Sequence, residues 1–270
     1  MRVLVGLAAL AVASSFPAIE ARAQSRPAPD LDRAPLATRS GWEGGVQIAH
    51  YHYEEPDLAK LIGPRAGAAG AFTFVRWGIF LKADARISAG SLKYQSRNTG
   101  TKDGNPDSIV ETRFVVGRDF RAGGFVLSPY AGLGYRYLYD DLRGYSSSGA
   151  AGYRRYSNYL YAPIGVTMRF GLGGPWIVAP TAEYDAFIRG SQQTMLSDLG
   201  GCNQDVTNAQ KKGRGYRAAV TVEKGRWALG PWMHYWNIKD SELEPLACGG
   251  GGLEPANWTR EIGFEFKYRF

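Results

Sequence analysis

Polar and apolar side chains alternate along the closing segment of the chain, residues 259–270, which ends on a phenylalanine. Successive side chains of a β-strand point to opposite faces, so this alternation predicts a strand with one apolar and one polar face. The apolar face carries Ile262, Phe264, Phe266, Tyr268 and Phe270, and the polar face carries Glu261, Gly263, Glu265, Lys267 and Arg269. The apolar row is mostly aromatic, which is typical of a strand that borders a membrane.

Nine earlier segments have the same strand character, and tight turns alternate with long polar loops between them. The turn at Trp77 and Gly78 and the polar loop 98–107 are examples of the two kinds of connection. The predicted segments are residues 42–53, 68–76, 80–95, 109–120, 125–139, 153–170, 176–189, 214–224 and 227–238, followed by the closing segment. We therefore predict an all-β fold, a single antiparallel up-and-down transmembrane β-barrel of about ten strands with short periplasmic turns and long extracellular loops. Eight and twelve strands stay open as alternatives.

The N-terminal end has the features of a secretory signal. Met1 and Arg2 are followed by an apolar run and then by Ala21-Arg22-Ala23, a small-x-small cleavage site. We predict a signal peptide over 1–23, a flexible periplasmic segment rich in proline over 24–40, and the barrel over 41–270. No later stretch reaches the roughly 20 apolar residues that a transmembrane helix requires.

The overall charge changes this interpretation little. The formal net charge is +7 and the sequence pI is about 9.3, but the basic residues are dispersed along alternating strands and form no basic run. We therefore expect no nucleic-acid partner. For an exported barrel, positive loops are expected to meet anionic lipopolysaccharide.

The segment 80–95 predicts which face is the lumen. Apolar side chains from Leu81 to Ala89 share one face, and the charged side chains share the other, so the charged row is expected to point inward. A charge that faces lipid at mid-bilayer costs about 2 to 4 kcal/mol. The same parity assigns to the lumen Lys82, Asp84, Arg86, Glu111, Arg113, Arg136, Glu183, Asp185, Arg217, Glu261 and Glu265, together with Tyr130 and Thr181.

These side chains predict a lumen filled by ion pairs and hydrogen bonds. A barrel of about ten strands is only modestly wider than eight-stranded barrels, whose interiors are filled, and much narrower than porins. An ion path or a catalytic groove among the same charges stays open as the alternative.

Few residues outside the lumen suggest chemistry. His50 and His52 share a face but have no third ligand within reach in the sequence, so we expect a pair at the membrane interface and no metal site. His234 is expected to be a satisfied interior group. Cys202 and Cys248, the only cysteines, fall in two long outer loops, and export predicts a disulfide between them.

Tyrosines are frequent in the outer half of the middle strands. They are Tyr135, Tyr137, Tyr139, Tyr145, Tyr153, Tyr156, Tyr159 and Tyr161. Rings that meet both acyl chains and water form a girdle at each membrane interface, and this is the role we predict for them. A sugar-binding or adhesive surface is the alternative.

The end signals and the architecture resemble those of Gram-negative outer-membrane barrels, in particular the compact eight- to ten-stranded class. The resemblance implies that Phe266, Tyr268 and Phe270 act as the C-terminal signal that the barrel-assembly machinery reads. It also implies the outer membrane as the location, with outer-membrane lipid and lipopolysaccharide as partners.

The chain also resembles the omptin surface proteases in strand count and loop alternation. Omptins carry paired aspartates at one outer rim and an Asp-x-His pair across the cleft. Here the segment 91–95 has no acid, and the loop with Asp198 and Asp205 has no histidine. No catalytic residue is therefore assigned.

The predicted function is a non-enzymatic outer-membrane barrel that displays surface loops for envelope structure, adhesion or contact with an unknown ligand. We expect no catalytic residue, no cofactor and no metal. A narrow porin-like channel for ions or small solutes is the first alternative, and an omptin-like rim hydrolase is the second.

Overall fold

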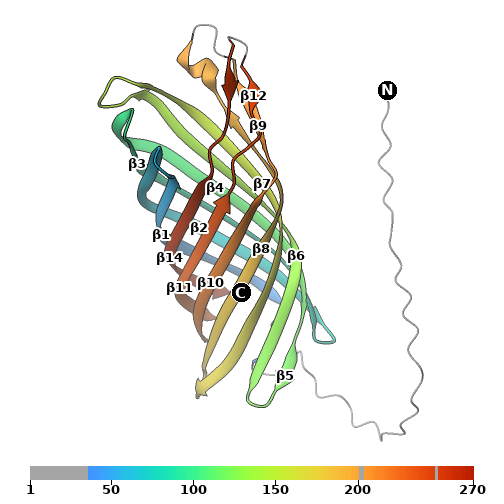
Figure 1. Ribbon diagram of the computed structural model, residues 1–270. Coiled ribbons are helices and arrows are strands. Elements are labelled where there is room, and N and C mark those ends of the chain that lie inside the picture. Colours follow the sequence, from blue (N-terminus) through green and yellow to red (C-terminus); the bar gives the residue numbers. More distant parts are fainter. Residues whose placement is uncertain (1–35, 201–203, 247–248) are drawn as a thin grey trace, which may run out of the picture.

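The computed structural model describes residues 36–200, 204–246 and 249–270, which form a closed antiparallel barrel of ten long strands (Figure 1). The predicted fold class and strand number are confirmed. The long strands are β1 (Gly41–Glu55), β2 (Ala59–Arg76), β3 (Ile79–Ser96), β4 (Gly100–Arg118), β6 (Phe125–Tyr145), β7 (Ala151–Gly173), β8 (Trp176–Thr194), β10 (Gly213–Lys224), β11 (Trp227–Ile238) and β14 (Asn257–Arg269). The short elements are β5 (Phe120–Ala122), the 3-10 helix η2 (Leu196–Leu199), β9 (Val206–Gln210), β12 (Glu244–Pro245) and β13 (Gly251–Gly252).

The barrel closes where the last strand meets the first. β14 pairs with β1 from Arg269 opposite Glu43 to Trp258 opposite Glu54. Both chain ends of the barrel therefore lie at the end that carries the short turns, which we call the short-turn end; the opposite end carries the long loops. The turn between β2 and β3 shows how tight these connections are, because Trp77 has a φ of 55° and Gly78 a φ of 74°. Positive φ at both positions is what a two-residue type I′ hairpin turn needs.

Several strands are longer at the long-loop end than the sequence predicts. β2 begins at Ala59, β4 at Gly100 and β8 ends at Thr194. The prediction of a loop over 98–107 is wrong, because residues 100–102 and 105–107 pair with β3 despite their turn-forming composition. A register shift between Leu92 and Tyr94 accommodates the extra residue, as a β-bulge does.

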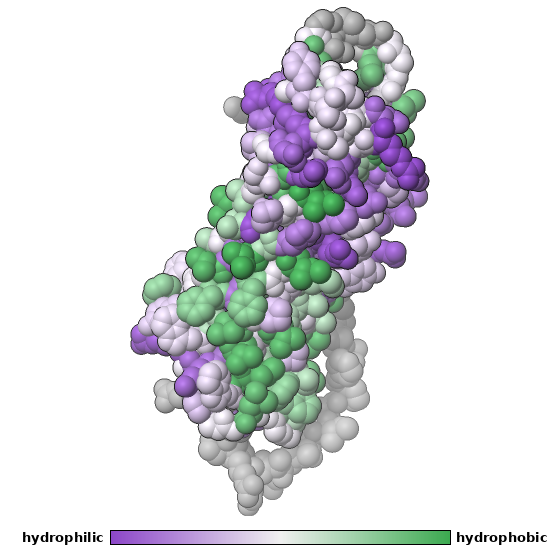
Figure 2. All heavy atoms as spheres, turned by 90° about the vertical axis from the view of Figure 1, so that its left-hand side faces the viewer, coloured by the Kyte–Doolittle hydropathy of each residue, from purple (hydrophilic) through white to green (hydrophobic). Residues whose placement is uncertain are grey.

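Apolar side chains cover the outer wall of the short-turn half. Val46, Phe114, Leu133, Ile164 and Phe264 all face outward, and each is between 45% and 61% exposed. Figure 2 shows hydrophobic residues gathered over this half and hydrophilic residues over the half that carries the long loops. The strands have 12 to 23 residues, more than the roughly 9 to 11 that a tilted crossing needs, so the barrel extends well beyond the apolar band.

Two sequence predictions fall on residues that the structure does not describe. The signal peptide over 1–23 lies outside the described residues, as do Cys202 and Cys248. Within 36–200, 204–246 and 249–270, no helix has the length and hydrophobicity needed to span a membrane.

Candidate functional site

Charged side chains cross the middle of the lumen as one continuous network. Arg86 donates to Glu111 (Nε to Oε2, 2.7 Å) and forms two 3.0 Å hydrogen bonds with Glu261. Arg217 donates to the same Glu111 (2.5 and 3.0 Å) and to Asp185 (2.7 Å). These residues come from five strands, β3, β4, β8, β10 and β14, so the network joins opposite walls of the barrel.

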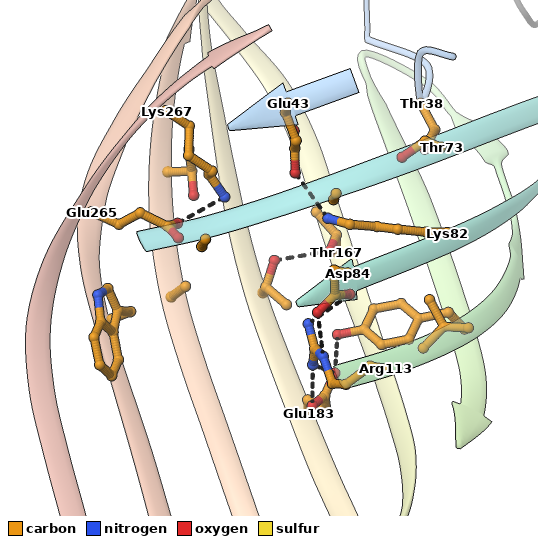
Figure 3. A pocket seen from close by; sticks show the side chains of 18 of the residues that line it. Thr38, Glu43, Thr73, Lys82, Asp84, Arg113, Thr167, Glu183, Glu265 and Lys267 are labelled. Atoms are coloured by element: carbon orange, nitrogen blue, oxygen red, sulfur yellow. Dashed lines mark hydrogen bonds and ion pairs between the residues drawn. The ribbon is translucent and has the colours of Figure 1, made fainter. Parts of the chain in front are cut away.

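A third arginine extends the network toward the short-turn end. Arg113 on β4 donates to Asp84 on β3 (2.8 Å) and to Glu183 on β8 (2.7 Å), as Figure 3 shows. Tyr130 also donates to Glu183 (2.7 Å). Bidentate arginine–carboxylate pairs of this kind are directional as well as strong, so they fix the positions of the side chains.

The structure places all eleven predicted lumen charges on the inner wall and brings nearly all of them into this network. Arg136 joins it through Glu261 (3.2 Å). Lys82 and Glu265 lie apart from it and pair instead with Glu43 (3.0 Å) and Lys267 (2.7 Å), respectively. Glu43 and Lys267 were not predicted as partners, although the alternation of their strands places both on the inner face.

A polar cavity of about 240 Å³ lies between the network and the short-turn end. Figure 3 shows Glu43, Lys82, Glu265 and Lys267 around it, with the Arg113 cluster at one side. Gln47 also lines the cavity and is 5% exposed, and its Nε2 has no hydrogen-bond partner in the described part of the chain. A cavity of this volume with polar walls can hold water.

The residues just before β1 lie at the mouth of this cavity. Thr38 donates to Asp119 from its backbone nitrogen (2.6 Å) and from its hydroxyl (2.8 Å). Arg39 donates to Glu223 (2.9 Å). The end of the segment predicted as 24–40 is therefore bound to the barrel, while residues 24–35 lie outside the described residues.

Toward the long-loop end, the charged network meets an apolar cluster inside the lumen. Trp236 and Tyr161 pack edge to face with ring centroids 5.0 Å apart, and Tyr159 lies 5.8 Å from Trp236. The cluster consists of Tyr51, Tyr53, Leu61, Leu92, Ile109, Leu138, Tyr159, Tyr161, Trp236 and Ile238. On β4 and β6 these residues follow the network residues toward the long loops, so the cluster forms the next layer of the filling.

The cluster corrects the prediction of a tyrosine girdle. Tyr135 is 43% exposed and faces outward, in agreement with a girdle, but Tyr159 and Tyr161 are 4% and 0% exposed. For these two residues the girdle prediction is wrong. It is also wrong for Tyr153, which lies on the same inward row of β7 and lines a pocket at the long-loop end. Their composition alone does not separate this row from the outward one.

A smaller polar cluster lies at the long-loop end of the lumen, around Arg155. Arg155 donates to Glu55 (2.5 Å), and Tyr53 donates to the same carboxylate (2.7 Å). Glu254, in the loop before β14, lies 3.9 Å from Arg155, and Asp140 lies 3.8 Å from it. Burial, together with the charge of Glu55, raises the pKa of Glu254 to about 8, although Arg155 acts in the opposite direction.

The histidines do not form a site with these acids. His52 bonds Glu54 (2.9 Å) and packs on Trp258, and His50 is exposed on the same outward face. His234 faces the lumen, but its Nδ1 has no partner among the described residues, so the prediction of a satisfied group is wrong in this respect. In the described ranges no three His, Cys, Asp or Glu side chains are grouped as a metal site requires.

The aromatic residues of the proposed assembly signal lie on the outer wall of the closing strand. Phe266 is 41% exposed and stacks on Trp227, with ring centroids 5.2 Å apart. Tyr268 and Phe270 pack edge to face at 5.3 Å. Their side chains are therefore available to the surroundings of the barrel.

Comparisons with known proteins identify the fold. The sequence matches no known protein family and no curated protein. The structure is similar to the outer-membrane protease OmpT from Escherichia coli, with a TM-score of 0.52 and 9% identity over 88% of this chain and 100% of that chain. Weaker likenesses include the transport unit of the autotransporter AIDA-I from Escherichia coli, with a TM-score of 0.42 and 10% identity over 91% of this chain and 94% of that chain. The Pseudomonas putida toluene transporter TodX has a TM-score of 0.37 and 9% identity over 88% of this chain and 92% of that chain.

The OmpT structure is an outer-membrane β-barrel, and the chain has this fold. At such low identity the likeness concerns the fold alone.

Proposed function

We propose that the chain is a non-enzymatic integral outer-membrane protein whose closed barrel holds its outer half and long loops at the cell surface. The observation that carries the proposal is the filling of the lumen. The network around Arg86 and Arg217 joins opposite walls, and the apolar cluster around Trp236 lies directly beyond it. A solute would have to break several buried ion pairs and then pass a closely packed layer of aromatic and aliphatic side chains.

The outer wall supports the membrane location. Soluble proteins rarely expose a continuous apolar surface of this extent. In a bilayer the same surface contacts acyl chains, while the backbone groups of every long strand are paired around the closed ring. The hydrophilic half beyond the apolar belt is then left to project from the membrane (Figure 2).

An aromatic row marks the outer border of the apolar belt on one side of the barrel. Tyr184, Tyr216 and Tyr235 contact one another in sequence across β8, β10 and β11, with ring centroids 5.4 and 6.4 Å apart. Trp258 on β14 continues the row, stacked on Tyr235 at 6.3 Å. Rings of this kind favour the level of the lipid headgroups.

Three arginines near this row support lipopolysaccharide as a partner. Arg189, Arg214 and Arg260 belong to β8, β10 and β14, and none has a carboxylate partner among the described residues. Arg260 lies over the Trp258 ring at 6.0 Å. Guanidinium groups pair well with phosphate, so their free charges suit the phosphates of lipopolysaccharide.

Conductance measurements test the closed barrel. We expect the refolded protein to give no single-channel steps in planar bilayers in which a sixteen-stranded porin conducts. Folding is checked by the shift in gel mobility on heating. Reproducible steps that change when Asp84 or Arg113 is neutralised would overturn the proposal and favour the narrow channel.

A further inference from the structure

We propose that a pocket at the long-loop end of the barrel binds an anionic sugar, a pyranose ring that carries a carboxylate. The pocket has a volume of about 160 Å³ and lies between the β1–β2, β3–β4 and β6–β7 hairpins. The inference rests on the proposed function, because this end must face the outside of the cell for an external sugar to reach it. It adds a ligand class to a surface whose partner is otherwise undefined.

The pocket is built by hydrogen bonds between the hairpins and needs no ligand to form. Ser147, at the tip of β6–β7, donates from its backbone nitrogen to the carbonyl oxygen of Thr101 (2.8 Å). Thr101 donates back from its own nitrogen to the Ser147 hydroxyl (2.9 Å). Tyr94, on the adjoining wall, bonds Thr99 through its hydroxyl (2.7 Å). A preformed pocket avoids the cost of ordering loops on binding.

The floor and walls of the pocket are rich in aromatic surface. The large apolar and aromatic residues of the lining are Tyr53, Leu61, Tyr94, Leu142 and Tyr153. A tyrosine offers an apolar ring face together with a polar hydroxyl. A pyranose matches both, because its C–H groups form an apolar face and its hydroxyls surround it. The pocket is smaller than the usual site for a drug-sized ligand, which suits a single sugar ring.

The charges of the lining favour an acidic sugar over a neutral one. The lining contains one carboxylate, Glu55, and three cations, Lys60, Lys102 and Arg155. Glu55 already accepts hydrogen bonds from Arg155 (2.5 Å) and Tyr53 (2.7 Å). Its charge is therefore used within the protein.

The two lysines keep their charge free. Lys102 donates to the neutral amide oxygen of Asn105 (2.5 Å) and has no carboxylate partner among the described residues. Lys60 likewise has no ion pair within that part of the chain. Glu254 and Asp140 approach Arg155 from the barrel interior and are not part of the lining. A ligand carboxylate would supply the missing partner for Lys102, and a neutral sugar would not.

Saturation-transfer difference NMR on the full-length mature protein in detergent micelles tests the proposal. The probes are methyl β-D-glucuronide and methyl β-D-glucoside, which differ in the carboxylate. We expect saturable binding of the glucuronide and about tenfold weaker binding of the glucoside, since a hydrogen bond to a charged group is lost.

Two variants place the binding at this pocket. Lys102→Met is expected to weaken glucuronide binding by about tenfold for the same reason. Lys93→Met is the matched control, because Lys93 faces outward on the same hairpin, 51% exposed, and pairs loosely with Asp103 (3.7 Å). Its affinity should equal that of the wild type. Tyr153→Leu removes the ring and its hydroxyl but keeps an apolar side chain, and we expect it to weaken binding of both sugars.

The proposal is overturned if folded protein shows no saturable binding, if both sugars bind equally, or if Lys102→Met and Lys93→Met behave alike. These outcomes are distinct from failure of the proposed function. A conducting bilayer would overturn the closed barrel without affecting sugar binding. Failure of a membrane-impermeant amine reagent to label Lys60 in whole cells would instead overturn the surface location.

Discussion

The strongest test of the lumen architecture is replacement of Arg217 by methionine. Arg217 is 7% exposed and bonds Glu111, Asp185 and the hydroxyl of Tyr161 (2.8 Å). After the replacement Glu111 keeps Arg86 at 2.7 Å. Asp185, 0% exposed, has no other cation among the described residues, so its buried charge is left uncompensated.

The expected loss of stability follows from Asp185, which loses its cation while Glu111 keeps one. Removal of one partner from a buried ion pair costs about 3 to 5 kcal/mol. With a urea dependence of about 2 kcal/mol per M, the unfolding midpoint should fall by roughly 2 M. Neutralising the orphaned acid should recover part of the loss, so the double variant Arg217→Met with Asp185→Asn is expected to be more stable than Arg217→Met alone.

Urea unfolding in detergent micelles, followed by tryptophan fluorescence and by heat-dependent gel mobility, measures both changes. Arg97→Met is the matched control, since Arg97 is 77% exposed and its pair with Asp57 (3.3 Å) lies in solvent. It should unfold with the wild type. The reasoning is refuted if Arg217→Met unfolds at the wild-type midpoint, or if Asp185→Asn lowers the stability of the double variant further.

Four other predictions concern the outer half and the chain end. Because the raised pKa of Glu254 keeps it protonated in the folded barrel, stability should fall by about 1.4 kcal/mol per pH unit between about pH 4.5 and the folded pKa of about 8. Urea titrations at pH 5 and pH 9 should show a smaller loss of stability for Glu254→Gln than for the wild type. An equal loss in the two proteins would contradict the raised pKa of Glu254. Replacing Arg189, Arg214 and Arg260 together by glutamine should reduce the increase in unfolding temperature that lipopolysaccharide gives the barrel. The unfolding temperature in micelles without lipopolysaccharide should not change. Deletion of Phe270 should reduce the amount of barrel in outer-membrane fractions while refolding in micelles is kept. Mass spectrometry without reduction should find Cys202 joined to Cys248, and two free thiols would exclude the disulfide.

Much of the barrel follows from local periodicity. The charged row from Lys82 to Arg86 alternates with apolar residues, and a period of two is enough to assign opposite faces to them. The same logic placed Glu261 and Arg217 in the lumen, where the structure has them. Strand number was also accessible, because turns and loops interrupt the alternation at regular intervals.

The outer ends of the strands were not accessible in this way. Residues 100–107 have the composition of a loop, and they form a strand because β3 offers an unpaired edge beside them. Tyr159 and Tyr161 are of the residue type that forms a girdle, but they belong to the row that faces inward and are therefore core residues. In both cases local preference is weaker than the gain from pairing and burial.

The sequence by itself determined the class of architecture and the two faces of each strand, because alternation is a property of neighbouring residues. Only the tertiary structure decided which charges meet across the lumen, since Arg86 and Glu261 are 175 positions apart and become neighbours when β14 closes on β1. It also decided that an apolar layer lies beyond those charges, and that three hairpin tips enclose a pocket. Contacts of this kind depend on barrel closure, which sets the height of each residue along the barrel axis. No local pattern in the sequence encodes that height.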